Sequence, residues 1–485
     1  MRRTAAREHA TIVGPFPLWV DRELAGFSAW YEMFPRSEGA TSTHGGTLRA
    51  AARRLPAIAA MGFDIVYLPP VHPIGESYRK GPNNSLIASA GDPGSPWAIG
   101  SKDGGHTAVH RELGTIADFD AFVSDADRVG LEVAMDYALQ CSPDHPWVKE
   151  KPEWFRHRPD GSIKYAENPP KKYQDIYPID FQTESKAELW AALREVAEFW
   201  IGHGVRVFRV DNPHTKALPF WEWLIAGIRE QHPEVLFLAE AFTRPRVMAR
   251  LAKLGFTQSY TYFTWRNGKG ELSEYLTELS QSELVDYFRP NFWVNTPDIL
   301  HQFLQRGGRP AFHIRAALAA LGAPSWGMYS GYELYENIPL REGSEEYMDS
   351  EKFQCRPRDW SAADTMAPYV TRLNQIRRRH AGAVASLRTL RLHHVSSDAI
   401  TCFSRTDPRT GDRLLVLVNL DPYNVREGTT WLDLSQLGLT HEETFEVHDE
   451  LGGAVYTWRG AANYVRLDPR DTVAHAFAVK PGSRA

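Results

Sequence analysis

The sequence predicts an α/β protein, a (β/α)8 TIM barrel with long loop insertions, followed by a C-terminal antiparallel β-sandwich domain. Strand-like and helix-like segments alternate in about eight units over about 350 residues, which suits a closed barrel better than an open sheet. After residue 388 the pattern changes to short alternating runs between polar turns, as at 399–403 and 414–419. Acidic residues also follow several of the strand-like runs. In a barrel of this kind the active site forms at the carboxyl ends of the strands.

The elements follow one another in chain order. Apolar runs predict strands, and apolar residues at helical spacing predict helices. The expected strands are 27–34, 64–68, 131–136, 205–211, 235–240, 259–265, 291–298 and 325–328, and the expected helices are 47–61, 116–129, 184–203, the segment from 265 to about 284, and 311–321. The expected domains are an N-terminal tail (1–16), the catalytic barrel (17–387) and the C-terminal β-domain (388–485). Two long loops, 69–114 and the inserted region 140–181, have the length of binding elements.

Composition restricts the class of function. The chain has 485 residues, a formal net charge of −5 and a pI near 6.4, so no basic field favours nucleic acid. Residues 1–9 are charged and lack the apolar segment of a secretory signal, and no run approaches a membrane span. Cys141, Cys355 and Cys402 are too widely spaced to predict a disulfide framework or a zinc site. A cytoplasmic enzyme without a membrane or nucleic-acid partner is therefore expected.

The run 205–213 is the most informative segment. Arg209 and Asp211 stand two apart near the end of an apolar strand, so their side chains leave on one face. A fixed cation beside a carboxylate keeps it ionised, as a nucleophile attacking a sugar carbon requires. Two further apolar runs end on Glu240 and on Asp298. A lone acid at a strand end is commonly a surface group, but three in this order with Arg209 favour a catalytic set.

These residues resemble the α-amylase superfamily of retaining glycoside hydrolases and transglycosylases. The resemblance is closest to its bacterial branch of maltosyltransferases, which use α-maltose 1-phosphate to extend α-1,4-glucans. It rests on Met135-Asp136, Arg209-x-Asp211, Glu240 and Thr296-Pro297-Asp298, and on FSAWYE (27–32), QCSPDHPW (140–147), AENPPKKYQDIYP (166–178) and REGSEEY (341–347). Cys141 and Thr296-Pro297 stand where many amylase relatives have histidine, which is similar to the maltosyltransferase pattern.

The resemblance implies partners as well as an activity. The expected substrates are α-maltose 1-phosphate and an α-1,4-glucan or maltooligosaccharide, and no cofactor is expected. Members of that branch begin with a separate β-sandwich domain and a helical insertion that help to build a homodimer. The resemblance therefore implies a homodimer, although only residues 1–16 precede the expected barrel here.

The resemblance also assigns roles to the four catalytic residues. Asp211, beside Arg209, would form a covalent maltosyl-enzyme, and Glu240 would protonate the departing phosphate and then deprotonate the glucan 4-hydroxyl. Asp298 would hold the sugar 2- and 3-hydroxyls. Asp136 would orient the others through hydrogen bonds, although a loop anchor is an equal alternative.

Further residues are expected to bind the substrate. Asn168, Lys171 and Tyr173 are spaced so that a turn could direct an amide, an ammonium and a phenol at one phosphate. The substrate-binding set is Lys80, Ser95, Gln140, Asn168, Lys171, Tyr173, Asp175, Asn212 and Lys352. Of these, Lys80, Gln140, Asp175 and Lys352 match family positions for the disaccharide, whereas a solvated surface lysine is the simpler reading of Lys171 by itself.

Two alternatives stay open at this point. An amylase-type hydrolase, or a transglycosylase acting on trehalose or maltose, shares the same fold and acids. An inactive sugar-binding homologue is the other. No metal is expected, because the spacing of His72, His106, His110, His145 and His214 shows no paired ligands.

Overall fold

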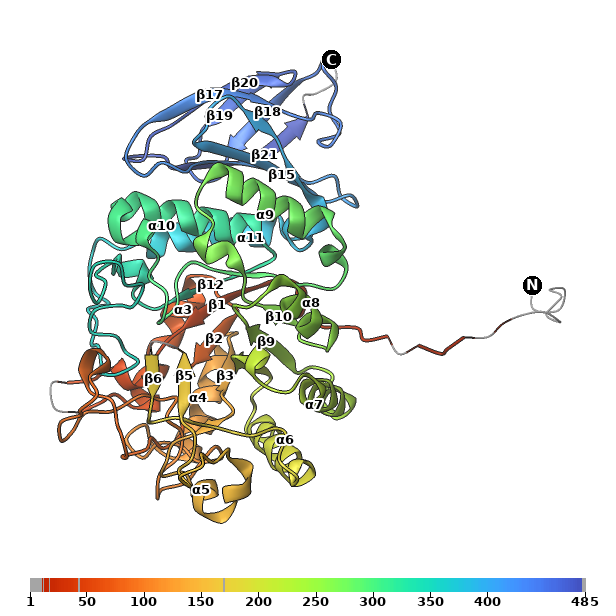
Figure 1. Cartoon of the computed structure of the whole chain (residues 1–485). Coiled ribbons are helices and arrows are strands. Elements are labelled where there is room, and N and C mark those ends of the chain that lie inside the picture. The colour runs from red at the N-terminus through yellow and green to blue at the C-terminus, as the bar shows by residue number, and fades with distance from the viewer. Residues whose placement is uncertain (1–10, 12, 17, 42–43, 169–170, 482–485) are drawn as a thin grey trace.

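A closed parallel sheet forms the centre of the molecule in the computed structural model, which describes residues 11, 13–16, 18–41, 44–168 and 171–481 (Figure 1). The strands in sheet order are β10 (Gln258–Ser259), β9 (Leu236–Glu240), β8 (Val207–Asp211), β3 (Glu132–Tyr137), β2 (Ile65–Leu68), β1 (Ser28–Glu32), β12 (Ser325–Tyr329) and β11 (Asn291–Trp293). A parallel bridge from Ser259 to Pro290 joins the two ends of this sheet. The strands therefore make a barrel, and the predicted fold class is confirmed.

Helices cover the outside of the barrel because each presents an apolar face at helical spacing. The main helices are α2 (Leu48–Ala52), α3 (Leu55–Ala60), α4 (Ile116–Arg128), α6 (Lys186–Gly202), α7 (Leu218–Gln231), α8 (Pro245–Lys253), α9 (Lys269–Gln281), α10 (Gln302–Gly322), α11 (Ala367–Arg379) and α12 (Ala381–Val384). In α6, for example, Leu189, Leu193, Val196 and Trp200 are buried at spacings of three or four residues. Among the described residues no helix has the length and apolar character to cross a membrane.

Strand periodicity separates two sets of side chains. Trp30, Tyr67, Val207 and Leu238 lie in a cluster inside the barrel, whereas neighbours such as Tyr31 belong to the larger cluster beneath the helices. Residues that share the parity of the inner set therefore point toward the barrel axis.

The inserted region after β3 carries its own short strands. It comprises β4 (Gln140–Cys141), α5 (Pro146–Glu150), β5 (Ala166–Asn168), β6 (Lys171–Tyr173) and β7 (Tyr177–Pro178). β5 and β6 form an antiparallel hairpin in which Asn168 is opposite Lys171. In the view of Figure 1 the two strands of this hairpin appear at the height of β3.

Two antiparallel sheets follow the barrel. One contains β13 (Leu390–Leu392), β15 (Ile400–Thr406), β16 (Arg413–Asn419), β21 (Ala474–Pro481), β18 (Thr444–Asp449) and β19 (Val455–Arg459), and the other contains β14 (His394–Val395), β17 (Arg426–Trp431) and β20 (Ala462–Leu467). They lie above α9, α10 and α11 in Figure 1, and buried Arg405 donates to the carbonyl of Gly322 at the end of α10. The division at residue 388 and the tail at 1–16 stay predictions.

Several predicted elements differ from the structure. The helix expected at 47–61 is two helices, because the chain turns at Arg53 and Arg54 before Pro56. The strand expected at 259–265 is only the end of β10, followed by a 3-10 helix at Tyr262–Trp265. The helix expected at 311–321 is the second part of α10, whose backbone breaks at Gly308 (φ 58°, ψ −160°) just before Pro310; a shorter helical segment from Gln302 precedes the break. Aromatic and β-branched residues do not by themselves distinguish a strand from a tight helical turn packed on the barrel.

Candidate active site

Asp211 and Glu240 end two neighbouring barrel strands. They are the last residues of β8 and β9 and are partners in the strand register. Asn212 ends β8 because its backbone turns into the left-handed region, at φ 44° and ψ 54°, which asparagine tolerates better than most residues. Neighbouring strands are about 4.8 Å apart, so the two carboxyl groups start from backbone positions one strand spacing apart.

One guanidinium joins three carboxyl groups. Arg209 Nη1 donates to Asp136 Oδ2 at 2.9 Å and to Asp211 Oδ1 at 3.0 Å, and Arg209 Nη2 lies 3.0 Å from Glu240 Oε1. Its side chain is 7% exposed. Arginine suits this position because its planar fork can serve several acceptors at once. The expected partnership of Arg209 with Asp211 is present, and it extends to β3 and β9.

Asp136 is the most enclosed of the three acids. Its Oδ2 also accepts hydrogen bonds from the Tyr67 hydroxyl at 2.5 Å and from Trp97 Nε1 at 3.2 Å. Burial raises the pKa of Asp136 to about 6, against the opposing attraction of Arg209. These three hydrogen bonds to Asp136 Oδ2 fix the carboxyl group, which in turn holds Arg209 in place.

Glu240 differs from Asp211 in its surroundings. Burial raises the pKa of Glu240 to about 8, Arg209 opposes the rise, and the charge of Asp211 adds to it. The backbone N–H of Asn212 donates to Glu240 Oε2 at 3.3 Å. A carboxyl group that keeps its proton near neutral pH is suited to act as a general acid.

The third acid is not at a strand end. β11 ends at Trp293, and Asp298 lies beyond it in a loop, where its backbone N–H donates to Thr296 Oγ1. The expectation that Asp298 ends its own strand is therefore wrong. Lys352 reaches the same point from another loop and forms a hydrogen-bonded ion pair with Asp298. This ion pair joins a predicted catalytic residue to a predicted substrate-binding residue.

The other predicted binding residues gather around Lys352. Asp175 is 2% exposed, burial raises its pKa, and the charges of Lys80 and Lys352 oppose that rise. Lys80 is 2% exposed, and its ammonium donates to the carbonyl of Lys172 at 3.5 Å. Tyr173 acts electrostatically on Lys352. Two lysines, an acid and a phenol from three distant segments thus converge next to Asp298.

The remaining predicted residues are less closely tied to this group. Gln140 Nε2 donates to the carbonyl of Trp97 at 3.4 Å, which links it to the neighbour of Asp136. Ser95 is buried two residues before Trp97. Asn212 is exposed beside Asp211, to which its amide donates at 3.4 Å. The side chains of Asn168 and Lys171 lie outside the described residues.

Sequence reasoning missed several groups in this site. Tyr67 and Trp97 donate to Asp136, and the ammonium of Lys216 donates to the backbone carbonyl of Asp211 at 3.0 Å. The parity of β2 could have identified Tyr67, which stands two after inward-facing Ile65. Trp97 and Lys216 lie in loops, where no periodicity signals the direction of a side chain.

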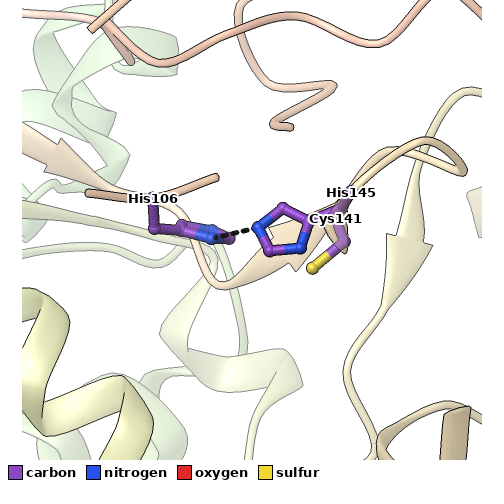
Figure 2. A group of neighbouring side chains, drawn as sticks. All are labelled: His106, Cys141 and His145. Carbon is purple, nitrogen blue, oxygen red and sulfur yellow. Dashed lines mark hydrogen bonds between the residues drawn. The ribbon is translucent and has the colours of Figure 1, made fainter. Parts of the chain in front are cut away.

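A separate group of potential metal ligands lies where the start of the inserted region meets the loop 69–114. His106, Cys141 and His145 are buried, and their ligand atoms lie within 4.8 Å of one another (Figure 2). The fold thus brings together histidines whose spacing in the sequence showed no pairing. Hydrogen bonds decide whether these atoms are available to a metal.

The two imidazoles form a relay of hydrogen bonds. The backbone N–H of Trp147 donates to His145 Nδ1, so neutral His145 carries its proton on Nε2, which lies 3.1 Å from His106 Nδ1. His106 Nε2 in turn donates to the carbonyl of Ala138 at 3.0 Å. Burial lowers the pKa of His106 to about 4 and that of His145 to about 2, so both stay neutral. A metal at His145 Nε2 would have to displace this proton, so the donor set does not fit a metal and ties the insertion to the barrel instead.

Curated relatives align with the whole chain. The chain is 59% identical over 490 residues to Alpha-1,4-glucan:maltose-1-phosphate maltosyltransferase 2 of Streptomyces coelicolor, covering 100% of this chain and 72% of the relative. It is 52% identical to the Pseudomonas aeruginosa enzyme named Alpha-1,4-glucan:maltose-1-phosphate maltosyltransferase, covering 97% of this chain and 70% of the relative. A family model described as "GLGE, C-terminal" matches residues 392–479.

Solved structures agree on the fold. The α-amylase of Geobacillus thermoleovorans, complexed with acarbose, superimposes with a TM-score of 0.72 at 15% identity, over 95% of this chain and 99% of that chain. An α-amylase of Lactobacillus plantarum gives a TM-score of 0.68 at 19% identity, over 94% of this chain and 99% of that chain. Similarity to solved structures at this level of identity shows the fold alone. The relatives that are 59% and 52% identical in sequence show the family. The chain therefore belongs to the α-1,4-glucan:maltose-1-phosphate maltosyltransferase family.

Proposed function

We propose that this protein moves maltosyl units from α-maltose 1-phosphate to the non-reducing end of α-1,4-glucans and releases phosphate, by a retaining mechanism with Asp211 as the nucleophile. The observation that carries the mechanism is the pairing of Asp211 and Glu240 across β8 and β9, with Arg209 between them. Retaining enzymes hold their two carboxyl groups about 5 to 5.5 Å apart, whereas inverting enzymes leave room for a water at about 6.5 to 9.5 Å. One strand spacing favours the retaining arrangement.

Asp211 and Glu240 divide the chemistry. Asp211 receives a hydrogen bond from Arg209 Nη1, a cation that stabilises the attacking carboxylate. It attacks C1 of the donor, the bond from C1 to the phosphate oxygen breaks, and Glu240 gives its proton to the departing phosphate. The glucan 4-hydroxyl then attacks C1 of the maltosyl-enzyme, Asp211 leaves, and Glu240 takes the proton of the hydroxyl. The raised pKa of Glu240 supports this role.

The residues around Lys352 and Lys80 are proposed to recognise the donor. Asp298, which Lys352 holds, is proposed to accept hydrogen bonds from the sugar 2- and 3-hydroxyls. Lys80, Gln140 and Asp175 complete the disaccharide site. Ser95, Asn168, Lys171, Tyr173 and Asn212 are proposed to hold the phosphate. These residues come from five separate segments of the chain, and a small number of polar groups from different segments is typical of a pocket for a small ligand.

The direct test is phosphate release from α-maltose 1-phosphate with maltohexaose as the acceptor. Asp211→Ala is expected to lower the rate by several orders of magnitude, as loss of a covalent nucleophile does. Glu240→Gln is expected to form a maltosyl-enzyme slowly and to retain it, seen as an adduct in the intact mass with a fluorinated donor. Hydrolysis of maltohexaose without any use of the phosphorylated donor would instead establish an amylase-type hydrolase.

Lys171 offers a test of donor specificity. Lys171→Ala is expected to weaken use of α-maltose 1-phosphate by about 2 to 5 kcal/mol in transition-state terms, as for truncation of one member of a buried charge pair. Maltosyl fluoride should be affected far less, because it carries no phosphate. Equal losses with both donors would make Lys171 structural, and no loss with either would make it a surface lysine.

Location and assembly stay predictions. The cytoplasm is the proposed location, because sugar phosphates are charged and do not cross membranes freely. A homodimer is proposed from the family resemblance. Cell fractionation and sedimentation equilibrium test these two proposals, and a salt-dependent shift with duplex DNA would contradict the absence of a nucleic-acid partner.

A further inference from the structure

Another carboxyl group lies at a strand end, beside those of Asp136, Asp211 and Glu240. Glu32 is the last residue of β1 and is 2% exposed. It has the parity of Trp30, which belongs to the cluster inside the barrel, whereas Tyr31 between them faces the helices and bonds to Glu333. In the register Glu32 is opposite Tyr67, whose hydroxyl donates to Asp136. Glu32 therefore points into the barrel at the level of the catalytic centre.

This carboxyl group has no donor for one of its oxygens. Among the described residues nothing forms a hydrogen bond with buried Glu32 Oε2. The cation that acts on Glu32 is Arg209, whose two Nη atoms already serve Asp136, Asp211 and Glu240. A buried carboxylate without a committed donor is costly, and such a group takes up a proton instead.

The surroundings of Glu32 also favour its protonated form. Burial raises the pKa of Glu32 well above its ordinary value, Arg209 opposes the rise, and three carboxylates add to it. The titratable groups that face it are Arg209 on β8, Asp136 on β3, Glu240 on β9, Asp298 in the loop after β11, Tyr67 on β2 and Tyr260 after β10. Arg209 is the one cation among these groups, and it is already bound to Asp136, Asp211 and Glu240.

We propose that Glu32 is a positioning residue that remains a neutral carboxylic acid during the reaction. Arg209 then stays bound to the catalytic carboxyl groups, because no further carboxylate competes for its N–H groups. Arg209 Nε is buried and also has no partner among the described residues, so an ionised Glu32 would compete for the guanidinium through it. The inference rests on the proposed function in one respect. A phosphorylated donor is itself negatively charged, so its binding is sensitive to the additional negative charge of an ionised Glu32.

The test compares two donors as the pH is raised. The specificity constant kcat/KM is measured for α-maltose 1-phosphate and for maltosyl fluoride, and the ratio of the two is followed from neutral to alkaline pH. In the wild type this ratio is expected to fall roughly tenfold over the pH range in which Glu32 ionises. A change of this size is what one added negative charge near the bound phosphate produces. Glu32→Gln cannot ionise, so its ratio should lack this fall.

Three comparisons separate this role from a structural one. Loss of the Glu240 proton is common to the wild type and to Glu32→Gln, so it cannot produce a difference between them. Glu32→Ala should lower kcat/KM, and Glu32→Gln should restore most of the loss because it keeps the shape of the neutral acid. Glu333→Gln is the matched control, a buried carboxyl group whose partner is Tyr31, and its ratio should follow the wild type.

Two activity results would overturn the proposal. One is the same alkaline fall in the wild type and in Glu32→Gln. The other is a ratio already higher in Glu32→Gln at neutral pH, which would mean that Glu32 is ionised in the wild type. Infrared spectra of the ligand-free proteins give a reading that does not depend on the reaction: Glu32→Gln should lose one protonated carboxyl stretching band at neutral pH. An unchanged band overturns the neutral state of Glu32, whereas failure of the wild type to use α-maltose 1-phosphate would overturn the proposed function alone.

Discussion

Replacing Arg209 with lysine tests whether one guanidinium organises the catalytic carboxyl groups. Arg209 Nη1 lies 2.9 Å from Asp136 and 3.0 Å from Asp211, and Nη2 lies 3.0 Å from Glu240. Lysine keeps the charge but offers a single nitrogen on a flexible stem, so it can hold about one of the three acids in place. Losing two charge-assisted contacts at about 1.5 kcal/mol each lowers the free energy of unfolding by about 3 kcal/mol. The misplaced nucleophile and acid should lower kcat/KM by roughly 100-fold.

Both quantities can be measured on the same preparation. Urea unfolding followed by circular dichroism gives the free energy of unfolding, and initial phosphate release gives kcat/KM. Arg229→Lys is the control, because Arg229 is a buried arginine that bonds to Asp21 rather than to a catalytic carboxyl group. It should lose stability and keep kcat/KM. If Arg209→Lys keeps kcat/KM within about twofold of the wild type, the claim that Arg209 organises the site is refuted.

Three further predictions follow from the contacts. The rate of phosphate release should fall as the pH rises through about 8, where Glu240 loses its proton, and Glu240→Gln should lack this limb of the pH profile. Lys352→Met should raise KM for α-maltose 1-phosphate by roughly tenfold or more, because Asp298 loses its cation; an unchanged Michaelis curve would contradict this. His380 joins the barrel to the C-terminal sheets through two carboxylates, which overcome its burial and raise its pKa to about 9. Since the folded state holds that proton more tightly, this stabilisation is complete below about pH 6.5 and up to about 3 kcal/mol is lost as the pH rises through about 9. His380→Gln should remove that slope from urea unfolding measured across this pH range, and an unchanged slope would show that His380 does not cause it.

The positions of Asp211 and Glu240 could be predicted because each ends a strand-like run, 205–211 and 235–240, and strands of a barrel end at the site. The position of Asp298 could not be predicted in the same way. The apolar run before it continues past Trp293, where β11 ends, and beyond Val294, whose backbone N–H still donates to the carbonyl of Gly327 in β12, the chain is a loop. An apolar run indicates that a segment is buried, but it does not distinguish a buried loop from the end of a buried strand. Glu32 was overlooked because a single acid closing a strand resembles a surface residue until its neighbours are known.

The alternation of residues along each strand establishes which side chains point into the barrel. The period of two along β8 places Arg209 and Asp211 on one face, and this depends only on local backbone geometry. The partners of those side chains, in contrast, depend on how distant segments of the chain pack together. Arg209 serves acids from three strands, and Lys352 meets Asp298 across 54 residues of chain. Contacts between distant segments form only when the barrel closes and its loops pack, because closure brings every strand end to one rim. Local periodicity records the direction of a side chain and carries no information about the partner that it will meet there.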